Sequence, residues 1–504
     1  MSSVRETTHD PSKSWRFLGF PTIKSCDIFN VVVKTTLVVF TVLYVSVFFY
    51  YSFSNQVQLP SCPHCDRLFS HRKFSDIHNN ISADSHEKTN ISHIMFGIAG
   101  SAKTWYGRRS YIELWWKPNV TRGFVWLDEK PPANYTWPET SPAYKISADT
   151  SRFNYTCWYG SRSALRLTRI VKESLEVGLD NVRWFVMGDD DTVFFVENLV
   201  TVLAKYDHNQ MYYIGDDSES VEQDMIHSYN TAYGGGGYAI SYPLAAELVR
   251  ILDGCLDRYA SLYGADQKIQ ACIAEIGVPI TKEPGFHQVD VKGNPYGLLA
   301  AHPLAPLVSL HHVNSVESLF PSLTRIEALK RLVSAYKMDP DRTLQHSFCY
   351  DLNRNWSVSV SWGYTLHLYP SLVTAKRMET AYLTFRTWKT YKDEPFTFNT
   401  QPLSQDQCER PIVYLLDRVE WVGKDKTLTT YKRQWNVLEK TCETDDYSAA
   451  LDVQQFNVSS TTLKSDIWKM APRRQCCDIF NGTDQGMLQV KIRGCNKFES
   501  VTPP

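Results

Sequence analysis

The stretch that decides the fold is RWFVMGDDDTVFFVENLV, which runs from Arg183 to Val200. Its first part is apolar and has the character of a buried strand, and the aspartates Asp189, Asp190 and Asp191 follow directly. Adjacent carboxylates repel one another and are costly to remove from water. The three therefore either lie in a solvated turn, with one of them capping the next helix, or surround a cation.

Strand-like and helix-like segments alternate on both sides of these aspartates. ISHIMFGIAGSA, GFVWLDE and MYYIG have strand character, whereas SALRLTRIVKESLEV and VENLVTVLAKY carry apolar residues at helical spacing. This alternation predicts an α/β fold with a mostly parallel sheet. Such sheets bind ligands at the carboxyl ends of their strands, which is where the aspartates fall.

Hard carboxylate oxygens in a DxD pattern suit Mg²⁺ or Mn²⁺, ions that commonly hold a diphosphate. A calcium loop of the EF-hand type is excluded because Val193 and Phe194 occupy its fifth and sixth positions. A haloacid-dehalogenase phosphatase would use the string DDDTV with Asp189 as nucleophile. The acidic motif GDD at 215–217 comes too early for that family, so this reading is only an alternative.

Further polar residues follow downstream. Four glycines at 234–237 can bring the backbone close to a ligand, or form a flexible loop. Asp266 precedes a helix, where an acid in the first turn also stabilises the helix start. His287, His311 and His312 are candidates to complete a metal site, although isolated histidines are more often structural.

Six motifs in order carry a more specific resemblance: WFVMGDDDTVFF, YIGDDS, YGGGGYAIS, GADQKIQACIAEIGVP, GFHQ and SLHHV. Together they resemble the Fringe-related glycosyltransferases of family 31, and most closely the plant Fringe-like proteins described by a domain of unknown function (604). The resemblance covers roughly residues 92–318. It implies a GT-A fold and an inverting transfer from a UDP-sugar, with Mn²⁺ or Mg²⁺ as cofactor.

The resemblance also implies roles for individual residues. Asp191 would be the leading metal ligand, Asp189 a second one, and Asp189 and Asp190 would lie beside the donor. A late histidine would complete the metal site; the HH pair is favoured over His287. The metal set is therefore Asp189, Asp191, His311 and His312.

The glycine-rich motif is expected beside donor and acceptor, through Gly235, Gly236 and Gly237. Asp266 matches the acid that serves as general base in the family. The family usually has a second acid just before it, whereas this chain has Ala265.

The N-terminal part predicts membrane attachment. Residues 30–53 are mostly apolar and carry no charge except for Lys34, basic residues precede them, and no Lys or Arg follows until Arg67. This pattern predicts a cytosolic tail over 1–29, a transmembrane signal anchor over 30–53 and a luminal stem over 54–91. A cleaved signal peptide is the alternative, and it is less consistent with a run that starts so late.

Glycosylation and cysteine patterns agree with that topology. Eleven of the twelve cysteines follow the apolar run, as do eight N-x-S/T sequons. The sequons begin at Asn80, Asn90, Asn119, Asn134, Asn154, Asn355, Asn457 and Asn481. An odd number of luminal cysteines leaves one thiol free or bridging two chains.

The 504 residues have a net charge of −1, which gives no indication of nucleic-acid binding. A GT-A domain is expected over 92–318 and a β-rich, disulfide-bearing region over 319–504. The predicted protein is a single-pass type II Golgi enzyme. It would be a hexosyl- or N-acetylhexosaminyltransferase that forms a β-1,3 linkage to a glycan or glycoprotein. A non-catalytic carbohydrate-binding relative is the second alternative.

Overall fold

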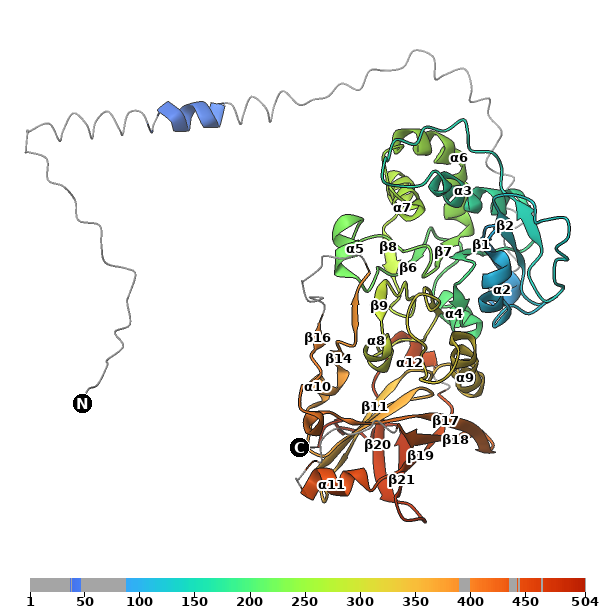
Figure 1. Ribbon diagram of the computed structural model, residues 1–504. Coiled ribbons are helices and arrows are strands. Elements are labelled where there is room, and N and C mark those ends of the chain that lie inside the picture. The colour runs from blue at the N-terminus through green and yellow to red at the C-terminus, as the bar shows by residue number, and fades with distance from the viewer. Residues whose placement is uncertain are drawn as a thin grey trace, which may run out of the picture. The chain divides into compact units, whose positions relative to one another are not determined.

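The computed structural model describes Leu37 and residues 39–46, 88–388, 399–434, 442, 445–463 and 466–503. The chain divides into two units, 1–86 and 87–504, and the second holds all the elements below (Figure 1). The predicted tail, anchor and stem lie almost wholly outside the described residues and stay predictions. Among the described residues, no helix has the length and apolar character needed to cross a bilayer.

A seven-stranded sheet forms the first part of the larger unit, in the order β3-β2-β1-β4-β7-β6-β8. All neighbouring strands are parallel except β7, which runs antiparallel to β4 and β6. The expected α/β sheet with parallel strands is therefore confirmed, and β7 makes it mixed. The strands are β1 (Ile94–Ala99), β2 (Gly123–Leu127), β3 (Tyr144–Ile146), β4 (Trp184–Asp189), β6 (Tyr213–Gly215), β7 (Tyr238–Ser241) and β8 (Ile280–Lys282).

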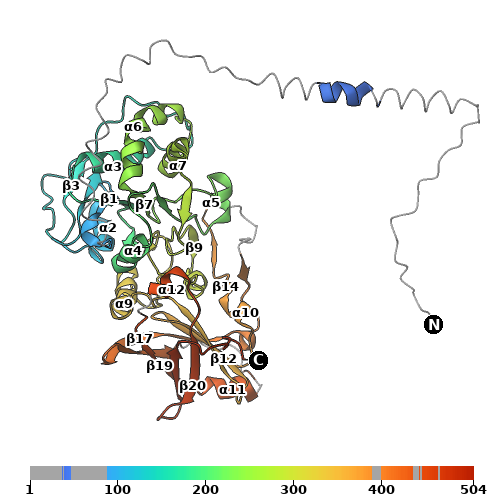
Figure 2. The ribbon, with the colours of Figure 1, turned by 180° about the vertical axis from the view of Figure 1, so that it is seen from behind.

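Helices cover both faces of this sheet because its strands are apolar on both sides. In β1, Met95 packs among residues of α3, α6 and α7, whereas Ile94 and Phe96 pack on the opposite face with α2 and α4. Figures 1 and 2 show α3, α6 and α7 grouped together. The helices are α2 (Trp105–Glu113), α3 (Ser163–Glu176), α4 (Val196–Leu203), α6 (Tyr242–Arg258) and α7 (Ala265–Ile276).

Short elements join distant segments around the first sheet. The two-residue strand β5 (Val193–Phe194) pairs antiparallel with β10 (Ser309–Leu310). Similarly, β9 (Val291–Gly293) pairs with β15 (Phe385–Thr387), which comes from the second half of the chain. The remaining short elements are η4 (Ile91–His93), α5 (Val221–Ile226), α8 (Tyr296–Ala300), β14 (Ala381–Tyr382), β16 (Thr400–Gln401) and η5 (Gln407–Glu409).

An eight-stranded sheet forms the second part, in the order β11-β12-β13-β17-β18-β19-β21-β20. All its neighbours are antiparallel except β19 and β21. The β-rich C-terminal region is thus confirmed. Its strands are β11 (His346–Asp351), β12 (Trp356–Ser361), β13 (Thr365–Tyr369), β17 (Ile412–Gly423), β18 (Lys426–Arg433), β19 (Gln455–Thr461), β20 (Cys476–Asn481) and β21 (Met487–Arg493). Its helices are α9 (Arg325–Met338), α10 (Ala375–Glu379), α11 (Asp445–Leu451) and α12 (Asp466–Met470).

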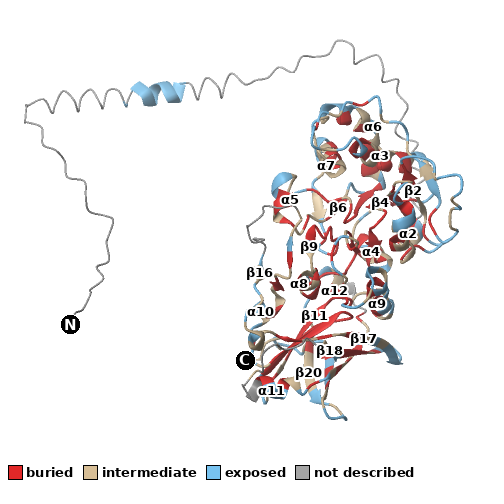
Figure 3. Cartoon of the chain, in the orientation of Figure 1, coloured by how far each residue is buried: buried red, intermediate tan, exposed pale blue. Residues whose placement is uncertain are grey.

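One apolar core continues from the first sheet into the second. Phe96 and Phe194 belong to the same buried cluster as Tyr364 and Val458. In Figure 3 buried residues line the strands of both sheets. The domain boundary expected at 318/319 falls just before α9, and apolar residues on both sides of it share this core.

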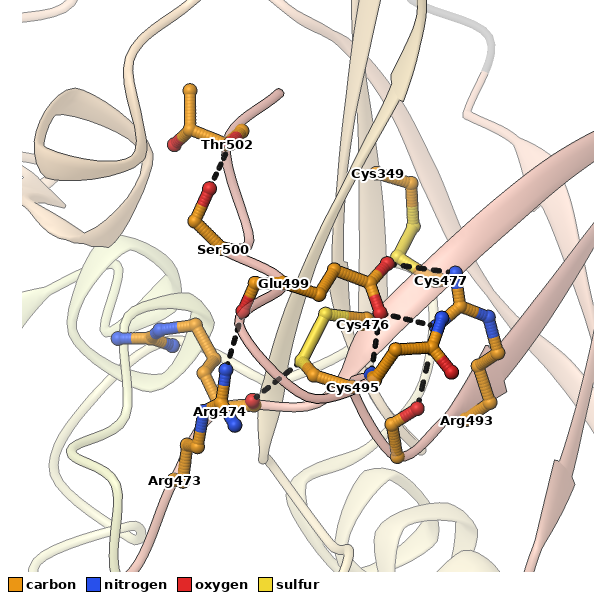
Figure 4. The surroundings of a disulfide bond; sticks show 12 residues. Cys349, Arg473, Arg474, Cys476, Cys477, Arg493, Cys495, Glu499, Ser500 and Thr502 are labelled. Carbon is orange, nitrogen blue, oxygen red and sulfur yellow. Dashed lines mark hydrogen bonds and ion pairs between the residues drawn. A yellow bond between two sulfur atoms is a disulfide. The ribbon is translucent and has the colours of Figure 1, made fainter. Parts of the chain in front are cut away.

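Four disulfides join cysteines of the larger unit: Cys255–Cys272, Cys349–Cys477, Cys408–Cys442 and Cys476–Cys495. Figure 4 shows the two that involve the adjacent Cys476 and Cys477. The Cys349–Cys477 bond links β11 to β20, the outermost strands of the second sheet, and so closes it into a barrel-like form. Among the described cysteines, Cys157 is buried and unpaired.

Candidate active site

The aspartates lie at the carboxyl edge of the first sheet. β1 and β4 are parallel neighbours, and their last residues, Ala99 and Asp189, are in register. A tight turn follows: the Thr192 amide donates to the Asp189 carbonyl at 3.0 Å, and the Asp189 amide donates to Thr192 Oγ1 at 2.8 Å. Thr192 Oγ1 in turn donates to the carbonyl of Gly235 at 2.7 Å. The turn and the glycine-rich loop are therefore joined.

Pairing of β5 with β10 brings His311 to the aspartates, because Val193 lies opposite Leu310. His311 Nε2 lies 3.2 Å from Asp191 Oδ1 and 3.7 Å from Asp189 Oδ2. One ligand atom from each of the three side chains lies within 4.8 Å of the other two. Two carboxylates and an imidazole on this scale form a plausible divalent-cation site.

The chemistry of this group fits Mn²⁺ or Mg²⁺. Asp191 Oδ1 is buried, and His311 Nε2 contacts it at 3.2 Å without good hydrogen-bond geometry. A buried carboxylate oxygen needs a partner, and a cation held between Asp189, Asp191 and His311 would supply one. The other oxygen, Asp191 Oδ2, accepts a hydrogen bond from Asn314 Nδ2 at 2.6 Å. This bond orients the carboxylate and leaves Oδ1 directed at the group.

The pKa values of the three side chains reflect their mutual charges. Burial raises the pKa of Asp189 to about 6. For Asp191, burial opposes ionisation, but the neighbouring His311 cation outweighs it and holds the pKa well below its usual range. Burial likewise opposes protonation of His311, yet the Asp191 carboxylate raises its pKa to about 9. A proton on His311 thus supplies the positive charge that a metal ion would supply in its place.

Asp190 points away from this group. Its Oδ1 accepts a hydrogen bond from Arg108 Nη1 at 2.8 Å, and its Oδ2 accepts one from Thr104 Oγ1 at 3.2 Å. Arg108 Nη1 also lies 3.6 Å from Asp191 Oδ2. Asp190 therefore fixes the first turn of α2 and holds the positively charged guanidinium of Arg108 at the edge of the site. Arg108 and Thr104 were not predicted as site residues. They follow β1, a parallel neighbour of β4, and that position in the sequence indicates the same edge of the sheet.

Two of the candidate histidines lie outside the metal group. His312 Nδ1 lies 3.0 Å from Asp290 Oδ1, and its ring stacks on Trp388 at 4.3 Å. His287 Nδ1 lies 2.9 Å from Glu219 Oε1 in a separate buried polar cluster. The two imidazole rings lie next to each other, with their centroids 3.7 Å apart, and His312 has a φ of +52°. The backbone therefore turns after His311, and His312 pairs with Asp290 while His311 faces the aspartates.

The glycine-rich loop packs against both the metal group and Asp266. A Cβ on Gly235 would lie 2.1 Å from His311 Cε1, and one on Gly234 would lie 2.5 Å from Asp266 Oδ1. The Gly236 amide donates to Gln288 Oε1 at 2.5 Å. Gly237 has a φ of +86°, a conformation that favours glycine. The loop needs small residues because its backbone fills the space beside the catalytic candidates.

Asp266 lies in the first turn of α7, and its Oδ1 accepts a hydrogen bond from the Gly234 amide at 3.0 Å. Burial, together with the negative charge of Asp189, raises the pKa of Asp266 to about 7. The side chain lines a cavity of about 150 Å³, which Gln288, Asp290 and His312 also line. A larger cavity of about 290 Å³ contains none of the predicted site residues and lies between α8 and the second sheet.

Comparisons with known proteins agree with this site. The model of the family described as "Protein of unknown function, DUF604" matches residues 223–477, which is just over half of the chain, and the chain belongs to this family. The model described as "Fringe-like" matches residues 145–294, which contain the aspartates, the glycine-rich loop and Asp266. The expected resemblance to Fringe-like proteins is thereby confirmed, while the plant subfamily stays a prediction.

Two curated relatives carry the name Beta-1,3-glucosyltransferase. The human protein is 29% identical over 119 residues, and the mouse protein is 28% identical over 131 residues. These segments are 24% and 26% of this chain, and they span 23% and 26% of the relatives' own lengths.

Proposed function

We propose that the protein is a glycosyltransferase that moves a sugar from a UDP-sugar to an acceptor hydroxyl with inversion. The observation that carries the proposal is a group of two aspartates and a histidine separated by a glycine-rich loop from a buried, high-pKa carboxyl. The match to the Fringe-like model covers these residues apart from His311 and supports the same class.

Asp189, Asp191 and His311 would hold Mn²⁺ or Mg²⁺, and Asn314 would orient Asp191. When bound, the metal ion supplies positive charge for a diphosphate leaving group. The glycine-rich loop, with Gly235, Gly236 and Gly237, lies between this group and Asp266. The donor sugar would lie beside this loop, with Asp189 and Asp190 near it.

Asp266 would act as the general base. Its ionised carboxylate would accept the proton of the acceptor hydroxyl as that oxygen bonds to the sugar carbon, opposite the departing diphosphate. A positioned base of this kind typically accelerates a reaction about 10²–10⁴-fold. The Gly234 amide holds the carboxylate in place through the 3.0 Å hydrogen bond.

Finer features of the proposal come from the resemblance, the relatives' names and the apolar N-terminal run. They are a β-1,3 linkage, a hexosyl or N-acetylhexosaminyl donor, a glycan or glycoprotein acceptor, and a single-pass type II position in the Golgi membrane. The match to the family of unknown function runs over residues 223–477, so it contains Asp266 as well as most of the C-terminal β-rich part, which lies wholly outside the Fringe-like match.

The test is an assay of the full-length protein against a panel of UDP-sugars with Mn²⁺ and glycan acceptors. Sugar transfer is expected, and Asp266→Asn should abolish it while keeping Mn²⁺-dependent UDP binding. UDP binding without transfer by the unaltered protein would favour the non-catalytic alternative. Phosphate release that requires Asp189 would instead indicate the phosphatase.

A further inference from the structure

Four rings form a continuous row beside the candidate base. Trp158 and Tyr159 pack edge to face at 5.3 Å, Tyr159 stacks on Tyr263 at 5.5 Å, and Tyr263 stacks on His227 at 5.2 Å. We call these four residues the ring row. They come from the loop before α3, the loop before α7 and the end of α5, segments far apart in the sequence.

The row starts in solvent and ends in the cavity at Asp266. Trp158 is 91% exposed and Tyr159 is 58% exposed, which is unusual for large aromatic side chains. Tyr263 and His227 line the 150 Å³ cavity together with Asp266. An extended molecule that reaches Asp266 along this row would therefore pass one aromatic ring after another. Tyr159, Tyr263 and His227 turn their faces toward one another, whereas Trp158 leaves most of its ring surface open to a ligand.

The backbone beneath the row is fixed. Tyr155 donates a hydrogen bond through its hydroxyl to the Tyr263 carbonyl at 2.7 Å, and the Thr156 amide donates to the Ala260 carbonyl at 3.0 Å. These bonds tie the loop that carries Trp158 to the loop that carries Tyr263. The backbone that carries the rings is consequently held in place before any ligand binds, which lowers the entropic cost of binding.

The charges around the cavity select the type of ligand. Asp266 and Asp290 line it, as do the amides of Gln223, Gln267 and Gln288. No Lys or Arg occurs among the described residues that line it. Carboxylates and amides accept hydrogen bonds from hydroxyls and repel anions. Aromatic faces, which carry partial negative charge, attract the C–H-lined face of a pyranose ring.

We propose that the ring row binds the acceptor as a neutral oligosaccharide and holds the sugar units beyond the one that reacts at Asp266. This inference rests on the proposed function, because it takes the cavity as the place of the acceptor hydroxyl. It adds that the acceptor is longer than one sugar, and that an acidic group on the sugar that enters the cavity is disfavoured.

The experiment compares neutral gluco-, galacto- and manno-oligosaccharides of one to four units as acceptors for the full-length protein. For at least one series, kcat/KM is expected to rise with length. Trp158→Ala should raise KM for the trisaccharide about tenfold, while kcat, KM for the UDP-sugar and transfer to the monosaccharide stay unchanged. Trp421→Ala is the matched control, because Trp421 is 48% exposed on β17, within the second sheet.

If Trp158→Ala lowers kcat/KM equally for the monosaccharide and the trisaccharide, Trp158 has only a structural role and the proposal is overturned. An unchanged kcat/KM for both acceptors would also overturn it. If the unaltered protein transfers no sugar, the proposed function fails, and calorimetric binding of the same oligosaccharides then tests the ring row alone. Binding that strengthens with length and weakens in Trp158→Ala supports the row, and binding independent of length contradicts it.

An N-glycan of the chain itself is the alternative occupant, because the sequon at Asn154 begins four residues before Trp158. The Trp158→Ala effect on the trisaccharide is expected to be the same in an Asn154→Gln background. Loss of the effect in that background would assign the exposed ring to the chain's own glycan and overturn the proposal.

Discussion

The three adjacent carboxylates at 189–191 are divided between two sides of the turn. Asp189 and Asp191 point to one side with His311, whereas Asp190 points to α2 and binds Arg108. The crowding is therefore relieved by two cations, His311 and Arg108, approaching from different sides. Of the two, His311 has the lower pKa, about 9, and a metal ion bound to the imidazole would displace its proton.

Asp191→Asn should weaken Mn²⁺ binding at least tenfold, because it removes a charged ligand and keeps the shape of the side chain. The measurement is calorimetric titration of Mn²⁺ into the metal-free protein with UDP present. Asp190→Asn is the matched control, and a smaller effect is expected because Asp190 is directed at Arg108. Equal losses in both variants would contradict the assignment of Asp191.

Asp266 is expected to make kcat/KM fall at acidic pH. A base must be ionised, so kcat/KM should rise with pH and level off above the pKa of about 7. A bound cation near Asp189 offsets the second cause of the raised pKa, so the midpoint should lie at or below 7. A profile measured between pH 5 and 9 that stays flat below pH 7 would count against Asp266 as base.

At the level of single residues, the sequence indicated the chemistry but not every partner. The DDD triplet and Asp266 were recognisable from their motifs. The choice between His311 and His312 depends on which way each side chain points after β10, which motif spacing does not encode. Arg108, Asn314 and Trp388 reach the site through tertiary contacts, so their roles became visible only with the fold.

The glycine-rich loop is the element that couples the metal group to the base. It is joined to the aspartate turn through Thr192, packs on His311 at Gly235 and donates to Asp266 at Gly234. Any change in this loop therefore acts on both halves of the site at once.

Gly235→Ala tests this coupling. Its Cβ would fall 2.1 Å from His311 Cε1, so the imidazole must move away from Asp191. We expect at least tenfold weaker Mn²⁺ binding with the fold retained, measured by titration and circular dichroism. Gly107→Ala in α2 is the control, because a Cβ there meets no atom within 4 Å. Unaltered Mn²⁺ binding in Gly235→Ala would contradict the proposed geometry.

The long helices and strands could be predicted from the sequence pattern, whereas the short ones could not. SALRLTRIVKESLEV became α3 and the apolar segment before the aspartates became β4, because burial of one face or both dictates their composition. Strands β5 and β10 have two residues each, too few for any periodicity, yet their pairing places His311. The reversed direction of β7 is likewise a property of chain topology and left no local signal.

At the scale of the whole molecule, several carboxyls are buried around the site. Burial raises the pKa values of Asp216, Glu219, Asp224 and Asp266 to about 7. In the unfolded chain such groups titrate near pH 4. Between about pH 4 and 7 these four groups bind more protons in the folded state than in the unfolded state, so their contribution to the free energy of unfolding falls as pH rises. Burial lowers the pKa values of His287, His302, His346 and His367, and these groups contribute in the opposite direction.

Each of the four carboxyls should accordingly raise the Tm of the metal-free protein at pH 5 relative to its Tm at pH 7.5. Differential scanning calorimetry in the presence of a chelator measures this difference. Glu219→Gln removes one of the four groups and should reduce the difference, whereas Glu139→Gln, an exposed residue, should leave it unchanged. The same Tm difference between pH 5 and pH 7.5 in Glu219→Gln and in the unaltered protein would contradict the assigned effect of Glu219.

The disulfide between Cys349 in β11 and Cys477 in β20 can form only late in the synthesis of the chain. Its cysteines are 128 residues apart, so at about 5–20 residues per second β11 waits about 6–25 s during synthesis for its covalent partner. When Cys477 emerges, Cys476 has emerged just before it and is itself destined for Cys495. An early bond between Cys349 and Cys476 is therefore a foreseeable error, and correct maturation calls for a disulfide isomerase acting late in translation.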